Sequence, residues 1–129
     1  MTVLIVYLPT DEGAAALRVG LAEAALRAQS VVVLNSPKRG SAEAVDRIPG
    51  GAVEDIEGAA RSHGVEVTIV HPDPEADIVE TLNALVAEHS ASLIVIGLRK
   101  RSAIGKFILG SQAQRILLEA EVPVLTAKV

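Results

Sequence analysis

The sequence of 129 residues contains no cysteine and no tryptophan, and its only aromatic side chains are those of Tyr7 and Phe107. Without cysteine there is no thiol nucleophile, no thiolate ligand for zinc and no disulfide. The scarcity of rings argues against nucleic acid as a partner, because bases stack on aromatic side chains. The core is therefore expected to consist of Val, Ile, Leu and Ala, a composition typical of helices packed on a parallel sheet.

The sequence also lacks long apolar runs, a basic leader and a positive net charge. No apolar run approaches the ~20 residues of a membrane-spanning helix, and the N-terminus has no basic segment of the kind that opens a secretory signal. The net charge of −4 gives no long-range attraction to nucleic acid or to anionic membranes. We expect a cytoplasmic protein that binds neither.

The length and the distribution of apolar residues predict one α/β domain over residues 1–129. Five apolar runs are expected to form strands: Val3–Tyr7, Val31–Leu34, Val65–Val70, Leu93–Ile96 and Val122–Leu125. Four of them are almost continuously aliphatic, which is typical of strands covered on both faces. The third alternates apolar with polar residues and is therefore predicted to lie at an edge of the sheet.

Between these runs, apolar residues recur at helical spacing in four segments. The four faces are Leu17, Leu21, Ala24 and Ala28; Val53, Ile56 and Ala60; Ile78, Leu82, Leu85 and His89; and Ala113, Leu117 and Ala120. Gly64 is expected to end the second helix. The alternation of strands and helices predicts a doubly wound parallel sheet with helices on both faces. In such sheets ligands bind beyond the carboxyl ends of the strands.

The segment Gly97–Ser111, GLRKRSAIGKFILGS, follows the fourth predicted strand and is unusually basic. It carries a third of the Lys and Arg residues of the chain, namely Arg99, Lys100, Arg101 and Lys106, and no acidic residue lies between Glu88 and Glu119. A basic segment at the carboxyl end of a strand suits an anion. The alternative is a solvated basic loop whose glycines only turn the chain.

The end of this segment is expected to open the last helix. Ser111 and Gln114 have the spacing of a capping box, and Gly110 precedes them. A helix N-terminus presents unpaired N–H groups and a partial positive charge, which favour phosphate. A glycine there allows the ligand to approach the backbone, because no Cβ stands in the way.

Two common phosphate-binding motifs are absent. Gly-x-Gly-x-x-Gly does not follow the first predicted strand, which excludes an ordinary dinucleotide site. Gly105-Lys106 is followed by Phe107 and lacks the glycine five residues earlier, so it is not a Walker A loop.

The pattern Gly-x2-Gly-x9-Gly-Ser/Thr after the fourth strand resembles that of the nucleotide-binding members of the universal stress protein family. Gly97, position 100 and Gly110-Ser111 have this spacing, and the ending EVPVLTAKV extends the resemblance over essentially the whole chain. The chain departs from the pattern twice. Lys100 replaces the second glycine, where it either blocks the approach to the backbone or supplies a charge. Leu8 replaces an aspartate near the end of the first strand.

The resemblance implies a sheet of order 3-2-1-4-5, a homodimer joined through the last strand, and ATP or another adenine nucleotide, with or without Mg²⁺, as ligand. The residues predicted to bind the nucleotide are Pro9, Thr10, Ser36, Gly97, Arg99, Lys100, Gly110, Ser111 and Gln112. Family position places Pro9 and Thr10 in the pocket, Ser36 is included because it ends the second strand, and Arg99 and Lys100 are expected to add charge. Thr10 is equally well explained as a helix cap, and Ser36 by ordinary turn chemistry.

Three functions remain open. The first is a nucleotide-binding regulatory module in stress response, which is not an enzyme and has an unidentified protein partner. The second is a dimeric interaction protein of the same fold without nucleotide, and the third is a weak ATP hydrolase.

Ser111 lacks the Gly-x-Ser-x-Gly setting of a nucleophile, and the histidines lack the spacing of metal ligands. We therefore expect no catalytic residue and no metal site. Arg115 is interpreted as a surface charge, and residues 36–52 as an exposed connection.

Overall fold

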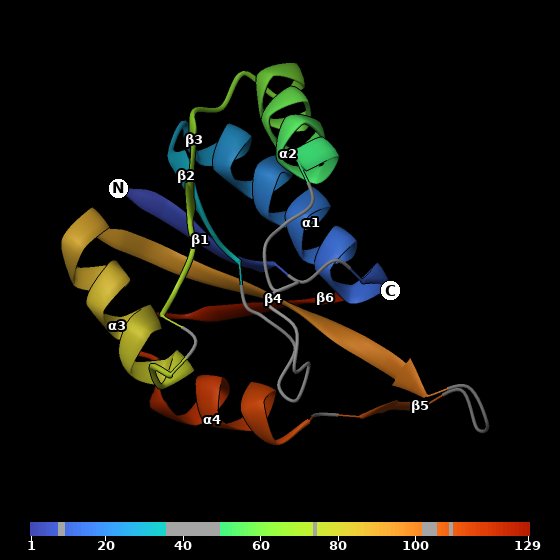
Figure 1. Cartoon of the computed structure of the whole chain (residues 1–129), viewed down its shortest axis with the longest axis vertical. Coiled ribbons are helices and arrows are strands. Elements are labelled where there is room, and N and C mark those ends of the chain that lie inside the picture. Colours follow the sequence, from blue (N-terminus) through green and yellow to red (C-terminus); the bar gives the residue numbers. More distant parts are fainter. Residues whose placement is uncertain (8–9, 36–49, 74, 102–105, 109) are drawn as a thin grey trace.

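The computed structural model describes residues 1–7, 10–35, 50–73, 75–101, 106–108 and 110–129, with the backbone alone for 50–52, 99–101 and 106–108. The elements are β1 (Thr2–Tyr7), α1 (Asp11–Arg27), β2 (Ser30–Asn35), α2 (Gly50–Ser62), β3 (Val67–Val70), α3 (Ile78–His89), β4 (Ala91–Arg101), β5 (Lys106–Ile108), α4 (Ser111–Glu119) and β6 (Val124–Lys128) (Figure 1). Strands and helices alternate as the sequence predicts, except that β5 is added after β4.

Five strands form a parallel sheet in the order β3-β2-β1-β4-β6. This confirms the predicted order 3-2-1-4-5, with β6 as the fifth parallel strand. β3 pairs with β2 alone among the described strands, as its alternating sequence indicates. The direction in which strands are added to the sheet reverses between β1 and β4. Their carboxyl ends therefore form the switch point, where open α/β sheets bind ligands.

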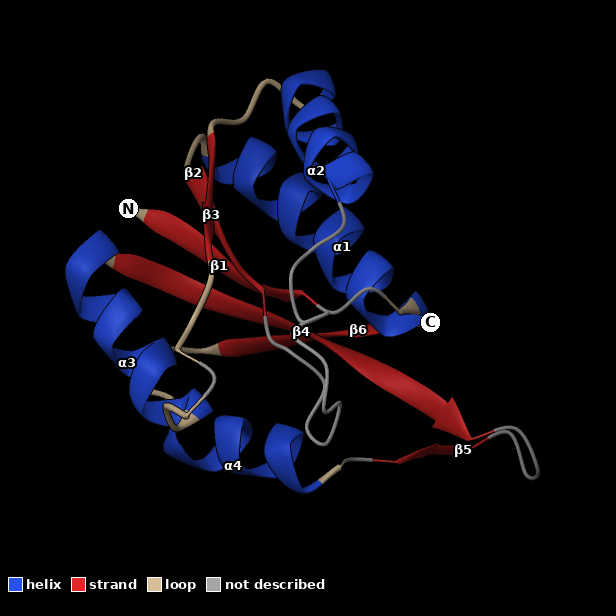
Figure 2. Cartoon of the chain, in the orientation of Figure 1, coloured by secondary structure: helices blue, strands red, loops and turns tan. Residues whose placement is uncertain are grey.

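Helices cover both faces of the sheet, with α1 and α2 on one side and α3 and α4 on the other (Figure 2). Side chains of successive strand residues point to opposite faces, so each central strand contributes to two cores. Ile5, Val33 and Val95 belong to the core under α1 and α2. Leu4 and Ile94 belong to the core under α3 and α4. Near-continuous aliphatic strands are thus explained by burial on both faces.

The ends of α1 and α2 follow the local sequence. The hydroxyl of Thr10 accepts a hydrogen bond from the amide of Gly13 at 3.2 Å and caps α1. The chain leaves α1 through Ala28, whose φ of 55° ends the helix, so this residue is exposed and does not join the predicted apolar face. Gly64 has a φ of 68° just after α2, as expected for a glycine that ends a helix.

The last two elements differ from the prediction in detail. In α4, Ile116 is buried, whereas Leu117 is 38% exposed. The face of α4 toward the sheet is therefore Ile116, with Ala113 and Ala120 partly buried against the same core on either side of it. β6 begins at Val124, two residues later than predicted. Of the described helices, none is long and apolar enough to cross a membrane.

β4 does not end at Ile96 as the sequence suggests. Its backbone continues beside β6, with Gly97 opposite Ala127, and then pairs antiparallel with β5, with Lys100 opposite Phe107. The two strands form a ribbon that extends past the parallel sheet (Figure 1). The interpretation of Gly97 as the first residue after the strand, and of Arg99 and Lys100 as loop residues, is therefore wrong. Apolar content alone did not reveal a strand that continues through basic residues.

Candidate functional site

A crevice lies at the switch point between β1 and β4. Its volume is about 60 Å³, and it is lined by Val6, Glu12, Gly13, Ile96, Gly97, Gln112, Ala113 and Ile116. These residues come from the end of β1, the first turn of α1, the middle of β4 and the first turns of α4. The crevice thus brings together Gly97 and Gln112, two of the predicted ligand-binding residues. Its volume corresponds to roughly two molecules of liquid water.

The N-terminus of α4 is uncapped by any described side chain. Gly110 occupies the N-cap position, with φ −68° and ψ 164°, and the helix begins at Ser111. The capping box predicted from Ser111 and Gln114 is therefore wrong, because Ser111 is already helical and its hydroxyl lies one residue too late to cap. The amides of the first turn have no intrahelical acceptor. Since Gly110 and Ser111 are exposed, a ligand can reach these amides.

The two glycines of the motif have different steric surroundings. A Cβ added at Gly97 would overlap the carbonyl oxygen of Glu12 and lie 2.5 Å from its carbonyl carbon. Glycine at this position therefore lets the first turn of α1 pack directly on β4. A Cβ at Gly110 would meet no described atom within 4 Å. Packing thus requires the absence of a side chain at Gly97, whereas the described residues place no such demand on Gly110.

The residues predicted for the nucleoside side are only partly described. Thr10 lies at the carboxyl end of β1, where it caps α1. Pro9, Ser36 and Leu8 lie outside the described residues, as does most of the connection 36–52, and Arg99 and Lys100 are described by their backbone alone. At the end of β2, Asn35 is buried, and its Nδ2 lies 3.4 Å from Nδ1 of His71.

Arg115 is not the isolated surface charge that the sequence suggests. Its Nη1 and Nη2 donate to the two carboxylate oxygens of Asp77 at 2.7 and 3.1 Å, and its Nε donates to Glu119 at 3.2 Å. Asp77 also caps α3 by accepting from the amide of Glu80. The hydrogen bonds from the Arg115 guanidinium and, to a smaller extent, from the Glu80 amide hold the pKa of the Asp77 carboxyl below its usual value. Sequence reasoning missed Asp77, whose only signal was its place just before the apolar face of α3.

Tyr7 ends β1 beside the switch point and packs against the core under α1 and α2. Burial, and then the negative charge of Asp55, raise the pKa of its phenol above the ordinary value. Since it is the only tyrosine and the chain has no tryptophan, its fluorescence reports on this end of the sheet.

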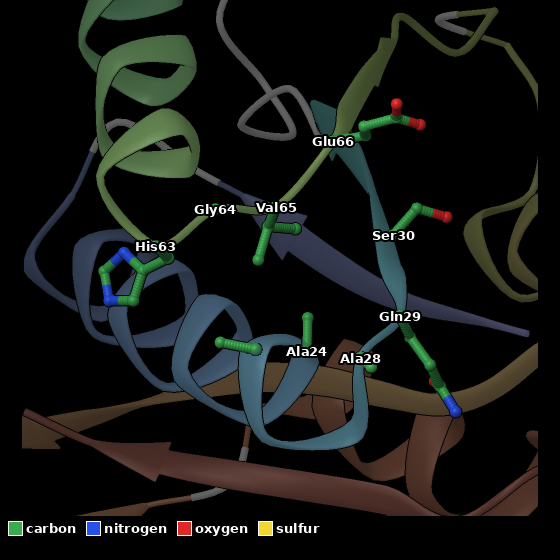
Figure 3. A pocket seen from close by; sticks show the side chains of 9 residues that line it. Ala24, Ala28, Gln29, Ser30, His63, Gly64, Val65 and Glu66 are labelled. Carbon is green, nitrogen blue, oxygen red and sulfur yellow. The ribbon is translucent and has the colours of Figure 1, made fainter.

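A larger hollow of about 460 Å³ lies at the opposite end of the sheet, between the last turns of α1 and α2. Val65 and Ala24 point toward one another across it, whereas the side chains of Ser30 and Glu66 point away (Figure 3). Helix C-termini carry partial negative charge. This hollow is therefore unsuited to phosphate, and it contains none of the predicted ligand-binding residues.

The described residues offer no metal site: nowhere among them do three His, Asp or Glu side chains gather as ligands. The described groups at the switch point include the backbone amides that begin α4 and the side chain of Gln112. These groups are suited to holding an anion.

Comparison with known proteins gives consistent results. The profile of the Universal stress protein family matches residues 1–128. A "Universal stress protein" of Mycolicibacterium smegmatis is 34% identical over 126 residues, covering 98% of this chain and 96% of that protein. A universal stress protein structure from Archaeoglobus fulgidus is 30% identical with a TM-score of 0.77, covering 98% of this chain and 97% of that one. The structure of the universal stress protein from Archaeoglobus fulgidus in complex with dAMP is 26% identical with a TM-score of 0.73, covering 98% and 96%.

Proposed function

Because this chain belongs to the universal stress protein family, we propose that it binds an adenine nucleotide and acts as a regulatory module in stress response rather than as an enzyme. The observation that carries the proposal is the uncapped, exposed N-terminus of α4 beside the crevice between β1 and β4. It supplies amide donors and partial positive charge at the place where such sheets bind ligands. The complex of an Archaeoglobus fulgidus relative with dAMP supports the same ligand class.

The proposed nucleotide lies with its phosphate on α4 and its nucleoside toward the ends of β1 and β2. The phosphate oxygens accept from the backbone of Gly110, Ser111 and Gln112, and the hydroxyl of Ser111 adds a donor. Arg99 and Lys100 contribute charge from the β4 ribbon, and Gly97 forms part of the crevice wall. On the nucleoside side the residues are Pro9, Thr10 and Ser36. ATP, ADP and AMP, with and without Mg²⁺, are the candidates.

Nucleotide binding is tested on the unmodified protein by calorimetry and by Tyr7 fluorescence. We expect saturable binding of one AMP, ADP or ATP per chain, weakened by added salt because the phosphate contributes through charge. Adenosine is the matched control, since it keeps the base and sugar and lacks the phosphate that α4 would hold. Adenosine is expected to bind at least tenfold more weakly, because a tenfold loss of affinity corresponds to the loss of about one charge-assisted hydrogen bond. No heat with any of the three nucleotides at millimolar concentration rules the proposal out.

A second candidate function, a ligand-free interaction module of the same fold, is favoured by one observation. The backbone around Lys100 pairs with β5 at the position where the family motif has its second glycine. Part of that backbone is therefore engaged in a ladder rather than directed at a ligand. Under this alternative the purified protein carries no nucleotide, and capture of its protein partner is unaffected by added ATP.

A homodimer through β6 is proposed for either function. Among the described strands β6 pairs only with β4, so the other edge of residues 124–127 faces no further described strand. A second copy related by a twofold axis would satisfy both edges at once. Light scattering at micromolar concentration is expected to give twice the chain mass of 13.4 kDa, and a stable monomer would contradict this prediction.

A further inference from the structure

The helix that carries the proposed anion site buries very little of itself. Of the nine residues of α4, all of them described, only Ile116 is buried, and Leu118 is 83% exposed. A helix of nine residues is too short to be stable in water without tertiary contacts. Contacts other than apolar burial must therefore contribute to the position of its first turn.

Polar side chains on α3 supply such contacts at the middle and at the C-terminal end of α4. At the middle, both carboxylate oxygens of Asp77 accept from the guanidinium of Arg115. At the C-terminal end, Asn83 donates to the carbonyl oxygen of Glu119 and accepts from the amide of Glu121, both at 3.1 Å. We call Asp77, Arg115 and Asn83 the α3–α4 clamp. α3 and α4 lie next to each other on the same face of the sheet (Figure 1).

The helix that supplies the clamp is firmly anchored. Val79, Leu82, Leu85 and Val86 of α3 are all buried in the core under α3 and α4. The two parallel hydrogen bonds between Asp77 and Arg115 fix direction as well as distance, as bidentate pairs do. Arg115 is the fifth of the nine residues of α4, so this pair acts nearer to the amides of the first turn than the contacts of Asn83 do.

We propose that Asp77 and Arg115 are positioning residues of the anion site: they hold the first turn of α4 where its amides converge on the phosphate. The inference rests on the proposed nucleotide binding. Binding groups act well only when held within roughly 0.5 Å of their productive positions. A guanidinium that is already paired with Asp77 and Glu119 acts through the helix and not as a direct partner of the ligand.

The opposite possibility, direct contact of Arg115 with the phosphate, predicts a result of opposite sign. Removing Asp77 would then free the guanidinium and tighten nucleotide binding. If Asp77 and Arg115 position α4, the same change loosens the first turn of α4 and weakens binding. The sign of the change in affinity therefore separates the two roles.

The decisive variant is Asp77→Ser. Serine keeps an oxygen that caps α3, but its side chain is too short for the bidentate contact with Arg115. We expect the Kd for AMP, measured by calorimetry, to rise roughly threefold to tenfold. In the ligand-free protein, hydrogen exchange at the amide of Gln114, which donates to the carbonyl oxygen of Gly110 at 3.0 Å, is expected to accelerate, while exchange at Leu85 and Val86 in α3 stays as in the wild type.

Glu119→Gln is the matched control. It weakens the contact that Arg115 makes within α4 and leaves the contact with α3 intact, so the Kd for AMP is expected to stay within twofold of the wild-type value. Asp77→Asn, which also retains a capping oxygen, replaces Asp77→Ser if the serine variant does not fold. Binding that is unchanged or tighter in the Asp77 variants, or unaltered exchange at α4, overturns the inference. If the wild type binds no AMP, the proposed function fails, and the exchange data alone decide whether Asp77 positions α4.

Discussion

Replacing Gly97 by alanine is expected to lower the free energy of unfolding by about 3 kcal/mol or more. The added methyl group would overlap the carbonyl oxygen of Glu12. The backbone of β4 fixes the position of this methyl group, and the oxygen belongs to the backbone of the first turn of α1, so no side-chain rotation relieves the clash. Either α1 moves off the sheet or β4 bends. Both movements disturb the packing of Ile5 and Val95, which are fully buried beneath α1.

Urea denaturation followed by circular dichroism measures this effect, with Gly58→Ala as control. Gly58 lies inside α2, and a Cβ there would lie 3.8 Å from the guanidinium of Arg61, an ordinary contact. Because glycine is unfavourable within a helix, the control substitution is expected to stabilise the protein by about 0.5–1 kcal/mol. The same chemical change thus has opposite signs at the two positions. A Gly97→Ala variant as stable as the wild type would show that α1 and β4 are not in the close contact described above.

Replacing Gly110 by valine is expected to weaken AMP binding at least thirtyfold while leaving the fold intact. The side chain would cover the approach to the amides at the start of α4, and each charge-assisted hydrogen bond lost costs about 1.5–3 kcal/mol. The backbone at Gly110 has φ −68° and ψ 164°, a conformation open to any residue. No described atom lies within 4 Å of the position that a Cβ would occupy.

Calorimetry gives the affinity of this variant and thermal denaturation its stability. Gly110→Ala is the graded control: its smaller side chain obstructs less, so its affinity is expected to fall between those of the wild type and the valine variant. Loss of binding with an unchanged unfolding curve assigns the ligand to the N-terminus of α4. A valine variant that binds AMP as tightly as the wild type would place the nucleotide elsewhere on the protein.

The two glycines show how far a sequence motif can be interpreted. Spacing alone treats Gly97 and Gly110 as equivalent parts of a phosphate-binding loop. The structure gives Gly97 a packing reason and leaves Gly110 without one, which makes Gly110 the better probe of ligand binding. The difference arises because Glu12, 85 residues before Gly97 in the chain, packs against it, and spacing between nearby residues carries no information about that contact.

Local pattern was sufficient for the order of elements and for the sheet. Runs of aliphatic residues such as Val31–Leu34 predicted strands buried on both faces, because only a sheet covered on both faces buries every residue of such a run. Helical spacing predicted the buried face of α2, whereas in α3 it predicted Leu82 and Leu85 but missed the buried Val79 and Val86. The family resemblance supplied the strand order, and with it the switch point between β1 and β4.

The sequence by itself determined the fold class, the sheet order through its family resemblance, and the segment in which an anion site is to be sought. Only the tertiary structure decided that β4 continues through Lys100, that Gly110 rather than Ser111 is the N-cap of the last helix, and that Asp77 pairs with Arg115. The physical reason is the range of the interactions. Periodicity records which face of an element is buried, whereas strand ends and ion pairs depend on partners that lie far away in the chain.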